Sequence, residues 1–513
     1  MNGDATVDVT LLLEGTYPYI RGGVSSWIHQ MIRGLPELRF AVIFIGGQKR
    51  DYGAMQYRFP PNVVRFEERF LMEAWRTADA GTERGNPHAF VASDALHAGF
   101  KTNNATQAAA AFSTAADLLG KPGGLTRRSF LYSRESWQQI CDYYGRYCRD
   151  PSFVDYFWTV RTMHAPLFDL VDIARHMPET RLVHAVSTGY AGHLGALAHE
   201  LRGFPLLLTE HGIYTKERRI DLAQAGWIHD ADNTYAGTLQ RDIGYTRELW
   251  IRFFEGLGRV TYRAASVVTA LYEGNSLQQQ RDGAPPERCR VVPNGIDIER
   301  FHAVRVPRER TVPPVLGLIG RVVSIKDIKN FIRAMPAVCS ALPKAEGWIV
   351  GPDDEDPSYA AECRALVSNL QLEGRVKFLG FQKTEEILPQ LGLVVLSSIS
   401  EAQPLVLLEG FAAGIPAVST AVGCCSELIF GATDEDRALG AAGATVPIAN
   451  PQALARAMTG LLVDPEAWRH AHDAAVARVE RFYSEDLMFQ RYRDLYREVG
   501  GMPGLPQTAA KER

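Results

Sequence analysis

Two cations in the second half of the chain, Arg321 and Lys326, are five residues apart and follow the apolar segment VLGLIG. Ligands of parallel α/β sheets bind beyond the carboxyl ends of the strands, so side chains at such a place are candidates for a site. A guanidinium offers a planar fork and an ammonium a point charge, and together they can bind one anion such as a diphosphate. The spacing alone equally suits two exposed cations that close a loop.

Two carboxylates, Glu401 and Glu409, follow a later apolar segment, LVVLSSIS. Pro404 suits the first turn of a helix, so the pattern predicts Glu401 on the loop and Glu409 inside the helix. The carboxylate of Glu409 can accept hydrogen bonds from ribose hydroxyls, and the amides around Pro404 and Leu405 can face a phosphate. The alternative is that Glu401 is an acid at a helix terminus and Glu409 a surface residue.

The first half of the chain offers a glycine pair. Gly22 and Gly23 follow the apolar run LLLEG and a Tyr-Pro-Tyr turn, and they open an amphipathic helix near Val24. Backbone without side chains can approach a ligand closely, and the amides of the helix start can point at phosphates or a sugar. A plain tight turn is the alternative. No G-x-G-x-x-G opens a helix after a strand, which excludes an NAD-dependent dehydrogenase.

A histidine, His211, follows the apolar segment PLLLTE and is predicted to lie at the carboxyl end of a strand, facing the ligand. The alternative is a structural histidine that bonds a loop backbone. Four charged residues come directly after it, and their pattern suits either contacts to an acceptor or solvated charges. They are Lys216, Glu217, Arg218 and Arg219.

Apolar segments alternate with helical segments along most of the chain, which predicts parallel sheets of the doubly wound type. The predicted fold class is α/β, with two Rossmann-like domains facing a cleft. The first domain covers residues 1–308, with a helical insertion over about 60–175, and the Pro-rich segment 306–315 is the predicted linker. The second domain covers 309–480. C-terminal helices over 481–513 pack back towards the first domain and end in a disordered tail.

Composition limits the classes of partner. With 55 basic and 59 acidic residues in a chain of 513, the formal charge is −4, which favours neither nucleic acid nor an anionic membrane as a partner. The N-terminus has no basic signal region and no apolar run is long enough to span a bilayer, so we expect a cytoplasmic protein. The acidic run Asp353–Asp356 precedes a helix, where acids complement the helix N-terminus; no metal site is predicted there.

These motifs resemble those of the family 4 glycosyltransferases, which have the GT-B fold. The resemblance rests on Arg321-x4-Lys326, on Glu401-x7-Glu409 and on Pro293–Asp297, PNGID. Within that family, the cytosolic glycosyltransferases of Pel exopolysaccharide biosynthesis (the PelF group) are similar over four stretches between residues 14 and 416. They are EGTYPYIRGGVSSWIHQ, TEHGIYTKERRIDL, GRVVSIKDIKNFI and SSISEAQPLVLLEGFAAGIP.

The resemblance implies a retaining transfer of a hexose from a UDP-sugar, such as UDP-glucose, to a growing polysaccharide. By the same resemblance, Arg321 and Lys326 would bind the diphosphate. Glu409 would bind the ribose and Glu401 the transferred sugar. His211 would approach that sugar. No cofactor or metal is implied. The implied partners are inner-membrane synthase and export subunits, through which the protein could attach to the membrane.

Two positions depart from the wider family pattern, which has glycine after its lysine and after its first glutamate. Asp327 and Ala402 stand there, which leaves the backbone contacts around the sugar open. Two other functions share the expected architecture. A UDP-sugar 2-epimerase would need carboxylates and a histidine placed for proton abstraction and no acceptor. A non-catalytic, nucleotide-sugar-binding subunit of a synthase would need binding groups only.

Overall fold

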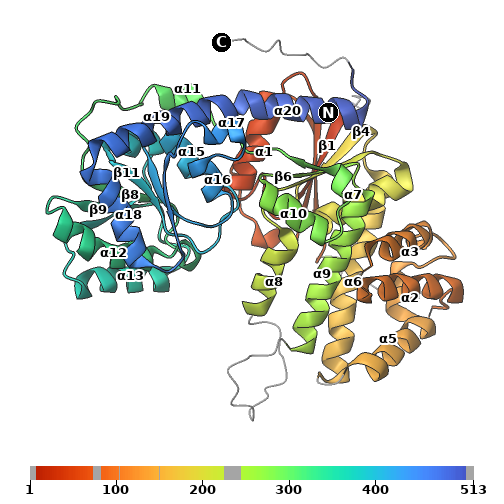
Figure 1. Ribbon diagram of the computed structural model, residues 1–513. Coiled ribbons are helices and arrows are strands. Elements are labelled where there is room, and N and C mark those ends of the chain that lie inside the picture. Colours follow the sequence, from red (N-terminus) through yellow and green to blue (C-terminus); the bar gives the residue numbers. More distant parts are fainter. Residues whose placement is uncertain (1–6, 73–82, 103, 149–150, 225–243, 504–513) are drawn as a thin grey trace. The chain divides into compact units, whose positions relative to one another are not determined.

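The computed structural model describes residues 7–72, 83–102, 104–148, 151–224 and 244–503. The chain divides into two compact units, shown in Figure 1. Unit 1 comprises Met1–Val291 together with Arg491–Arg513, and unit 2 comprises Val292–Gln490.

Unit 1 contains a seven-stranded sheet in the order β3-β2-β1-β4-β5-β6-β7, and each neighbouring pair is parallel. Its central strands are almost wholly buried apolar runs, which is typical of parallel sheets covered on both faces. The strand order reverses between β1 and β4, which makes that position the switch point of the sheet. The strands are β1 Val7–Glu14, β2 Phe40–Gly46, β3 Val63–Phe70, β4 Thr180–Ala185, β5 Leu206–Glu210, β6 Val267–Ala270 and β7 Cys289–Val291.

Ten α-helices are described in this unit before residue 291. They are α1 Gly23–Gly34, α2 Pro87–Lys101, α3 Ala105–Leu118, α4 Arg127–Tyr132, α5 Arg134–Tyr147, α6 Phe153–His176, α7 Tyr190–Arg202, α8 Tyr214–Gln224, α9 Tyr245–Ala264 and α10 Glu273–Arg281. The region 60–175, predicted as a helical insertion, contains α2 to α5 and most of α6. It also contains β3, which extends the edge of the sheet, so the helical part begins only after this strand.

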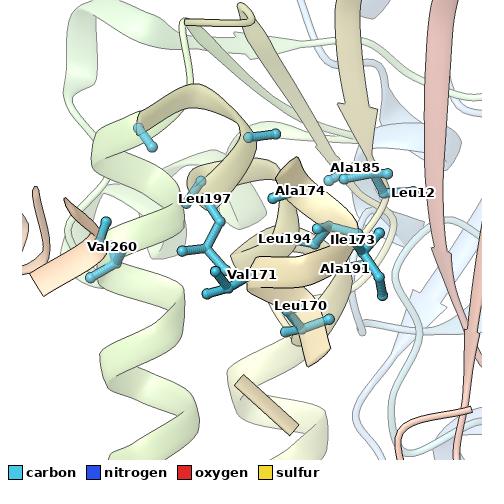
Figure 2. Packing of buried hydrophobic residues seen from close by; sticks show 14 of the residues in the cluster. Leu12, Leu170, Val171, Ile173, Ala174, Ala185, Ala191, Leu194, Leu197 and Val260 are labelled. Atoms are coloured by element: carbon cyan, nitrogen blue, oxygen red, sulfur yellow. The ribbon is translucent and has the colours of Figure 1, made fainter. Parts of the chain in front are cut away.

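The core of unit 1 is centred on α7, which lies against α6, α9 and the sheet (Figure 2). Small residues on α7 allow this close approach: at Gly195 a side chain would meet Leu206 of β5, because an added Cβ would lie 2.6 Å from it. Leu194 and Leu197 fill the space between helices and sheet, and both are fully buried. The core therefore fixes β1, β4 and β5, whose carboxyl ends carry the polar residues described below.

Unit 2 contains a six-stranded parallel sheet in the order β10-β9-β8-β11-β12-β13 (Figure 1). Its order reverses between β8 and β11, so the two strands that precede Arg321 and Glu401 are direct neighbours at the switch point. The strands are β8 Val315–Ile319, β9 Glu346–Val350, β10 Val376–Gly380, β11 Leu393–Leu396, β12 Ala417–Thr420 and β13 Gly443–Val446. The helices are α11 Ile298–His302, α12 Ile328–Ala341, α13 Pro357–Asn369, α14 Thr384–Ile387, α15 Leu405–Ala412, α16 Cys425–Phe430, α17 Asp434–Arg437, α18 Pro451–Val463 and α19 Pro465–Phe482.

The division between the units lies after Val291, earlier than the predicted boundary at 308. The Pro-rich segment 306–315 is not a linker, because it is packed into unit 2. The buried Val306 donates its N–H to the carbonyl of Ala413 over 3.0 Å, and Arg310 Nη1 donates to the carbonyl of Pro389 over 2.9 Å. Its prolines belong to an extended segment that leads into β8 within unit 2.

Helix α20, Glu485–Gly500, begins in unit 2 and ends in unit 1. Its second half contributes two buried tyrosines to unit 1: the Tyr496 hydroxyl lies 2.9 Å from His184 Nδ1, and the Tyr492 hydroxyl 3.2 Å from Thr209 Oγ1. The predicted disordered tail falls on 504–513, outside the described residues. In the described parts of the chain, no helix has both the length and the apolar character needed to cross a membrane.

Candidate functional site

The switch point of unit 2 holds an ion pair between Lys326 and Glu401. Lys326 ends the 3-10 turn Ser324–Lys326 after β8, and Glu401 lies on the loop after β11. The Nζ–Oε1 distance is 2.5 Å, and the side chains are 23% and 13% exposed. The hydroxyl of Ser398 donates to the same oxygen over 2.6 Å. The structure thus brings together the predicted lysine and the first predicted glutamate, in a pair that is only partly shielded from water.

Arg321, the other predicted cation, pairs with a different carboxylate. Its Nη1 lies 2.6 Å from both oxygens of Glu355, and each side chain is about half exposed, 54% and 52%. An exposed pair of this kind stabilises a protein by only about 0–1 kcal/mol. The guanidinium can therefore exchange Glu355 for a phosphate at little cost, although the structure does not place it on the same group as Lys326.

The acidic run Asp353–Asp356 has roles within the domain. Asp356 caps α13, because its carboxylate accepts from the N–H of Tyr359 over 3.1 Å. Asp353 pairs with Arg364, and Glu355 with Arg321. The prediction that acids here complement a helix N-terminus is confirmed for Asp356. Among the described residues, no group of three or more His, Cys, Asp and Glu side chains is arranged to hold a metal ion.

Glu409 lies on α15, half-buried. Burial raises the pKa of this carboxyl to about 7; nearby Arg300 opposes the shift and Glu385 adds to it. Arg300 itself is paired with Glu385 over 2.5 Å. Within the described residues, the Glu409 carboxylate makes no hydrogen bond or ion pair. A half-buried carboxylate without a partner is a ready acceptor for ligand hydroxyls.

The loop before α15 is held by the PNGID motif. The N–H of Asn294 donates to Gln403 Oε1 over 2.7 Å, and Asp297 caps α11 by accepting from the N–H of Arg300 over 3.0 Å. A Cβ on Gly295 would lie 2.4 Å from the carbonyl oxygen of Ser484, so only glycine fits. The motif therefore holds the loop before α15 and the start of α11 in place within unit 2.

The start of α15 differs by one position from the prediction. Pro404 is the N-cap and Leu405 the first helical residue, and no side chain caps this end. The first amides of α15 are thus left without a side-chain acceptor and can donate to an anion.

The two departures from the family pattern have different local meanings. Asp327 has φ 43° and ψ 52°, in the left-handed region that glycine adopts most easily and Asp tolerates better than most residues. The Ser397 hydroxyl fixes this turn by donating to the carbonyls of Lys326 and Asp327, over 2.9 Å each. Ala402 is not among the residues with positive φ, so nothing in the backbone requires glycine there.

In unit 1, the switch point opens into a cavity of about 700 Å³. It is lined by the carboxyl ends of three neighbouring strands: Glu14 of β1, Ser187 after β4 and His211 after β5. Aromatic side chains form much of its wall: Tyr52, Tyr190, Tyr214, Trp250 and Phe254. Flat aromatic faces beside carboxylates suit a ligand that has both apolar faces and hydroxyl groups.

His211 is the least satisfied polar group of this cavity. Neither ring nitrogen has a hydrogen-bond partner in the described structure, and burial lowers the pKa of the imidazole to about 4. Its ring meets Trp27 edge-on, with centroids 4.5 Å apart. The histidine is therefore neutral at pH 7, and no backbone group of the described structure bonds its ring.

The glycine pair does not line this cavity, although the next residue, Val24, does. Gly22 and Gly23 are exposed, and a Cβ on either would meet nothing within 4 Å. Gly22 is the N-cap of α1 in an extended conformation that any residue adopts. Unit 1 by itself gives no steric reason for glycine at either position.

Sequence reasoning missed Glu210, which is 1% exposed. Four groups donate to its carboxylate: the Tyr262 hydroxyl at 2.6 Å, Gln279 Nε2 at 3.1 Å, the Thr188 hydroxyl at 3.1 Å and the N–H of Tyr214 at 3.2 Å. Burial raises the pKa of this carboxyl to about 7, although the four hydrogen bonds act to lower it. Glu210 ties the segments after β4, β5 and β6 together, and only its position beside His211 could have drawn attention to it.

Glu14 was also missed, because it reads as the end of an apolar run. Its Oε2 accepts from the N–H of Ala191, in the first turn of α7, over 3.2 Å. Its Oε1 accepts from the Tyr214 hydroxyl over 3.2 Å and lies 3.8 Å from Arg218 Nη2. The signal available was position alone: the last residue of the first strand of a doubly wound sheet.

The strand orders and the polar groups at both switch points define the class of protein. Each unit is a Rossmann-like, doubly wound domain, and the fold is GT-B. Solved structures of this fold include the Anabaena protein HepE in complex with UDP and glucose, with a TM-score of 0.56 and 16% identity over 95% of this chain and 99% of that chain. Sucrose-phosphate synthase from Thermosynechococcus elongatus has a TM-score of 0.55 and 17% identity over 96% and 99%. At these identities the likeness shows the fold alone.

The chain belongs to the family described as Domain of unknown function (DUF3492), whose model matches residues 7–287. Residues 313–464 match the model for glycosyl transferases group 1. The first of these matches lies in unit 1 and the second in unit 2.

Two curated relatives are similar over parts of the chain. An exopolysaccharide phosphotransferase of Streptomyces coelicolor is 30% identical over 237 residues, 46% of this chain and 23% of that protein. A D-inositol 3-phosphate glycosyltransferase of Salinispora tropica is 32% identical over 331 residues, 60% of this chain and 62% of that protein. The chain spans less than two thirds of the length of either relative.

Proposed function

We propose that this protein is a retaining glycosyltransferase that moves a hexose from a UDP-sugar to a growing exopolysaccharide. The observation that carries the proposal is the switch point of unit 2. There a partly exposed lysine, Lys326, is adjacent to the carboxylate of Glu401, and α15 begins with uncapped amides. The match of this unit to glycosyl transferases group 1 supports the same assignment.

In this proposal the donor binds in unit 2. Lys326 and Arg321 leave their carboxylates for the diphosphate, which offers more charge than either glutamate. Glu409 accepts from the ribose hydroxyls, and the amides at Pro404 and Leu405 face a phosphate. Glu401, released by Lys326, is then free to accept from hydroxyls of the transferred sugar.

The reaction breaks the bond between the sugar's anomeric carbon and the diphosphate, and it forms a bond from that carbon to an acceptor hydroxyl, which loses its proton. UDP leaves with the bonding electrons, so negative charge grows on the diphosphate as the bond breaks. Fixed cations therefore stabilise the transition state more than the bound donor. No step requires a metal or a cofactor.

The family resemblance assigns His211, in unit 1, to the transferred sugar. The neutral imidazole, with both nitrogens unpartnered, can accept from one hydroxyl and donate to another group. The aromatic walls of the 700 Å³ cavity offer stacking surfaces for sugar rings of the acceptor. Gly22 and Gly23 stay assigned to the donor's phosphates or sugar by the sequence, since no contact within unit 1 explains them.

The finer assignment is to the PelF group, with retention of anomeric configuration, a UDP-hexose or hexosamine donor and a cytoplasmic location. The exopolysaccharide phosphotransferase among the relatives supports a role near exopolysaccharide, and HepE in complex with UDP and glucose supports the donor class. Attachment to an inner membrane through synthase or export subunits belongs to this proposal as well.

Calorimetric titration of the full chain with UDP-, GDP- and ADP-sugars tests the donor, and NMR of the products tests the reaction. We expect binding of UDP-sugars in preference to the others, and a glycosidic product with the donor's anomeric configuration. Conversion of a UDP-sugar to its C2 epimer in the absence of an acceptor would identify a 2-epimerase. Binding without turnover in the presence of a polysaccharide acceptor would identify a non-catalytic binding subunit. Absence of nucleotide-sugar binding would overturn the proposal.

A further inference from the structure

A second polar cavity of unit 1 has no role in the proposed transfer. It has a volume of about 420 Å³ and lies between α8, α9 and α10. It is separate from the cavity of His211, because alternate residues of the β5–α8 segment face the two spaces. Lys216 and Arg219 line the 420 Å³ cavity, whereas Glu217 and Arg218 line the other. The structure thus divides the charged run that the sequence left undecided.

Three cations of this cavity make no ion pair within the described residues. They are Lys216 and Arg219 on α8, one turn apart, and Arg281 at the end of α10, and all three are exposed. Most arginines elsewhere in the described structure contact a carboxylate or a carbonyl, as Arg202 and Arg288 do. Three unpaired cations around one cavity repel each other and favour a bound anion.

The carboxylates of the cavity do not cancel this charge. Its lining includes Arg259 as a fourth cation and two acids, Glu255 and Asp282, which leaves an excess of two positive charges. Both oxygens of Asp282 are taken by neutral donors: Gln278 Nε2 at 2.9 Å and the Thr215 hydroxyl at 3.1 Å. Asp282 is therefore engaged in holding α8 to α10 and not in pairing the cations.

The N-terminus of α10 adds donors at one end of the cavity. Gly274 and Asn275, in the first turn, line the cavity, and the N-cap residue Tyr272 makes no side-chain cap. The side chain of Asn275 is 7% exposed, and its amide nitrogen has no hydrogen-bond partner in the described structure. Leaving a buried donor without a partner costs about 1–3 kcal/mol, so a ligand oxygen that accepts from this amide would offset that cost.

We propose that this cavity binds a phosphate- or diphosphate-bearing ligand. The amide of Asn275 and the first N–H groups of α10 donate to one phosphate, which they meet at the positive end of the helix. Arg219, Lys216 and Arg281 close around its remaining oxygens. A phosphate monoester carries a charge of about −1.5 to −2 at pH 7, which matches the excess charge of the lining. This site goes beyond the proposed donor site, which lies in unit 2.

Calorimetric titration with inorganic diphosphate tests the site on the full chain. All variants carry Lys326→Ala, so that the lysine proposed to hold the donor does not contribute. Arg219→Ala and Arg281→Ala should each weaken diphosphate binding by about 10-fold or more, because each removes a charge-assisted bond. Both residues are exposed, so folding is preserved. Arg181→Ala is the matched control, since it removes the same charge at the amino end of β4, whereas α8 and α10 follow the carboxyl ends of β5 and β6. It should change binding less than about 2-fold.

A second variant, Asn275→Asp, separates a built site from general attraction to basic residues. It replaces the buried donor with a carboxylate and should abolish binding, while Arg181→Ala does not. Sedimentation with phosphatidylcholine vesicles, with and without an isoprenoid diphosphate, then distinguishes the source of the phosphate. Binding that needs both the lipid diphosphate and Arg219 assigns a lipid headgroup, and binding of the free diphosphate alone assigns a soluble ligand. No diphosphate binding at millimolar concentration, or equal affinity in Arg219→Ala and Arg181→Ala, would overturn the proposal.

Discussion

The two sheets share the same reversal of strand order, and different chemistry stands at the two reversal points. In unit 2, Lys326 and Glu401 form a partly exposed ion pair after β8 and β11. In unit 1, the ends of β1 and β5 carry Glu14 and the neutral, unpartnered His211 beside an aromatic-walled cavity. Glu14 accepts from an amide and a hydroxyl and lies 3.8 Å from Arg218 Nη2. The switch point of unit 2 is dominated by a short ion pair at 2.5 Å, whereas that of unit 1 has a looser pair at 3.8 Å among groups suited to hydroxyls.

This difference shows how one architecture can serve two kinds of ligand. The exposed Arg321–Glu355 pair is worth little in water, so a diphosphate can displace its carboxylate cheaply. Lys326, in a less exposed pair, exchanges one carboxylate for a ligand of higher charge. An unpartnered imidazole and aromatic faces give an anion little, but they suit the hydroxyls and faces of a sugar. The comparison predicts that charge-removing substitutions in unit 2 lower both nucleotide affinity and turnover, whereas substitutions at His211 lower turnover and leave nucleotide affinity unchanged.

The largest effect is expected for Lys326→Ala. Turnover with a UDP-sugar should fall about 10²–10³-fold, because the cation acts on charge that develops in the transition state, and UDP should bind more weakly. Steady-state kinetics and calorimetry measure the two effects. Lys329→Ala is the matched control, because that lysine is on the neighbouring helix α12 and pairs with Glu362.

The same substitution leaves Glu401 without its partner, so lost stability could imitate lost chemistry. The double variant Lys326→Ala/Glu401→Ala removes that unpaired charge and should recover stability, which shows how much of the loss in Lys326→Ala comes from the unpaired carboxylate. Unchanged activity in Lys326→Ala would contradict the proposal that this lysine binds the diphosphate of the donor in unit 2.

A smaller effect, a fall in kcat of about 10²-fold, is expected for His211→Ala. The cost in stability should be limited to the lost packing against Trp27, because no hydrogen bond of His211 is lost in the described structure. His184→Ala gives the opposite pattern. That buried histidine bonds both the Tyr496 hydroxyl and the Thr209 hydroxyl, each over 2.9 Å, so its removal should cost about 1–3 kcal/mol of stability. Thermal melting and steady-state kinetics of both variants measure these effects. If His211→Ala lowered stability but kept its turnover per folded molecule, His211 would be a structural residue and not one that acts on the substrate.

The next effect in size is the pH dependence of nucleotide binding. We expect UDP affinity to change about 10-fold, the scale of one hydrogen bond to a charged group. The pKa of Glu409 is raised to about 7 by burial, so the carboxyl is largely protonated below that pH. If its ionised form accepts from ribose, UDP affinity should rise as pH increases through about 7 and level off above it. Glu409→Gln should weaken UDP binding at pH 8 and remove this rise. Calorimetry at several pH values, with a phosphate-free buffer, measures both.

The same raised pKa has a consequence for stability. Because the folded protein holds this proton more tightly than the unfolded chain, Glu409 lowers stability as pH rises from about 4 to about 7. Glu210 adds to this slope, since burial raises its pKa in the same way. The free energy of unfolding is measured against pH for wild type and for Glu409→Gln, and the difference between the two slopes is the contribution of Glu409. A pH-independent affinity for UDP in wild type would show that the ribose contact does not depend on this carboxylate.

Much of the fold was readable from the sequence, because apolar strands separated by helices are a local, repeated signal. Strand β3 was missed: its sequence, VVRFEERF, is charged, as suits the edge of a sheet. The linker was misplaced because prolines mark both linkers and extended segments packed inside a domain, as at 306–315. Local sequence cannot tell these apart, since the difference lies in the partners of the backbone.

The candidate site was predictable where position along a strand sufficed. Lys326, Glu401 and His211 each follow a strand, and the topology brings them to the switch points. Glu355, the partner of Arg321, was not predictable, because it lies 34 residues further on in another loop. Nor was the four-bond network of Glu210, since its donors come from segments up to 69 residues away. Pairings that depend on tertiary folding leave no local trace.

The smallest effect concerns Asp327, where the chain departs from the wider family pattern. Its left-handed conformation, φ 43°, costs a residue with a Cβ about 1–2 kcal/mol relative to the right-handed one. Asp327→Gly removes that strain but increases the entropy of the unfolded chain by about 0.4–1 kcal/mol, so a net gain of about 0.5 kcal/mol in stability is expected. Asp327→Val, with a branched side chain that tolerates this region poorly, should lower stability by more than 1 kcal/mol, about the scale of such strain.

Urea unfolding of unit 2, followed by tryptophan fluorescence, measures both Asp327 variants. Because Asp327 is fixed directly after Lys326 by the Ser397 hydroxyl, its turn also sets where the ammonium points. Asp327→Gly should therefore keep UDP affinity within about 3-fold, whereas Asp327→Val should weaken it together with stability. A glycine variant that is less stable than wild type would show that the aspartate side chain contributes more than its strained backbone costs, and that the departure from the family pattern serves unit 2 itself.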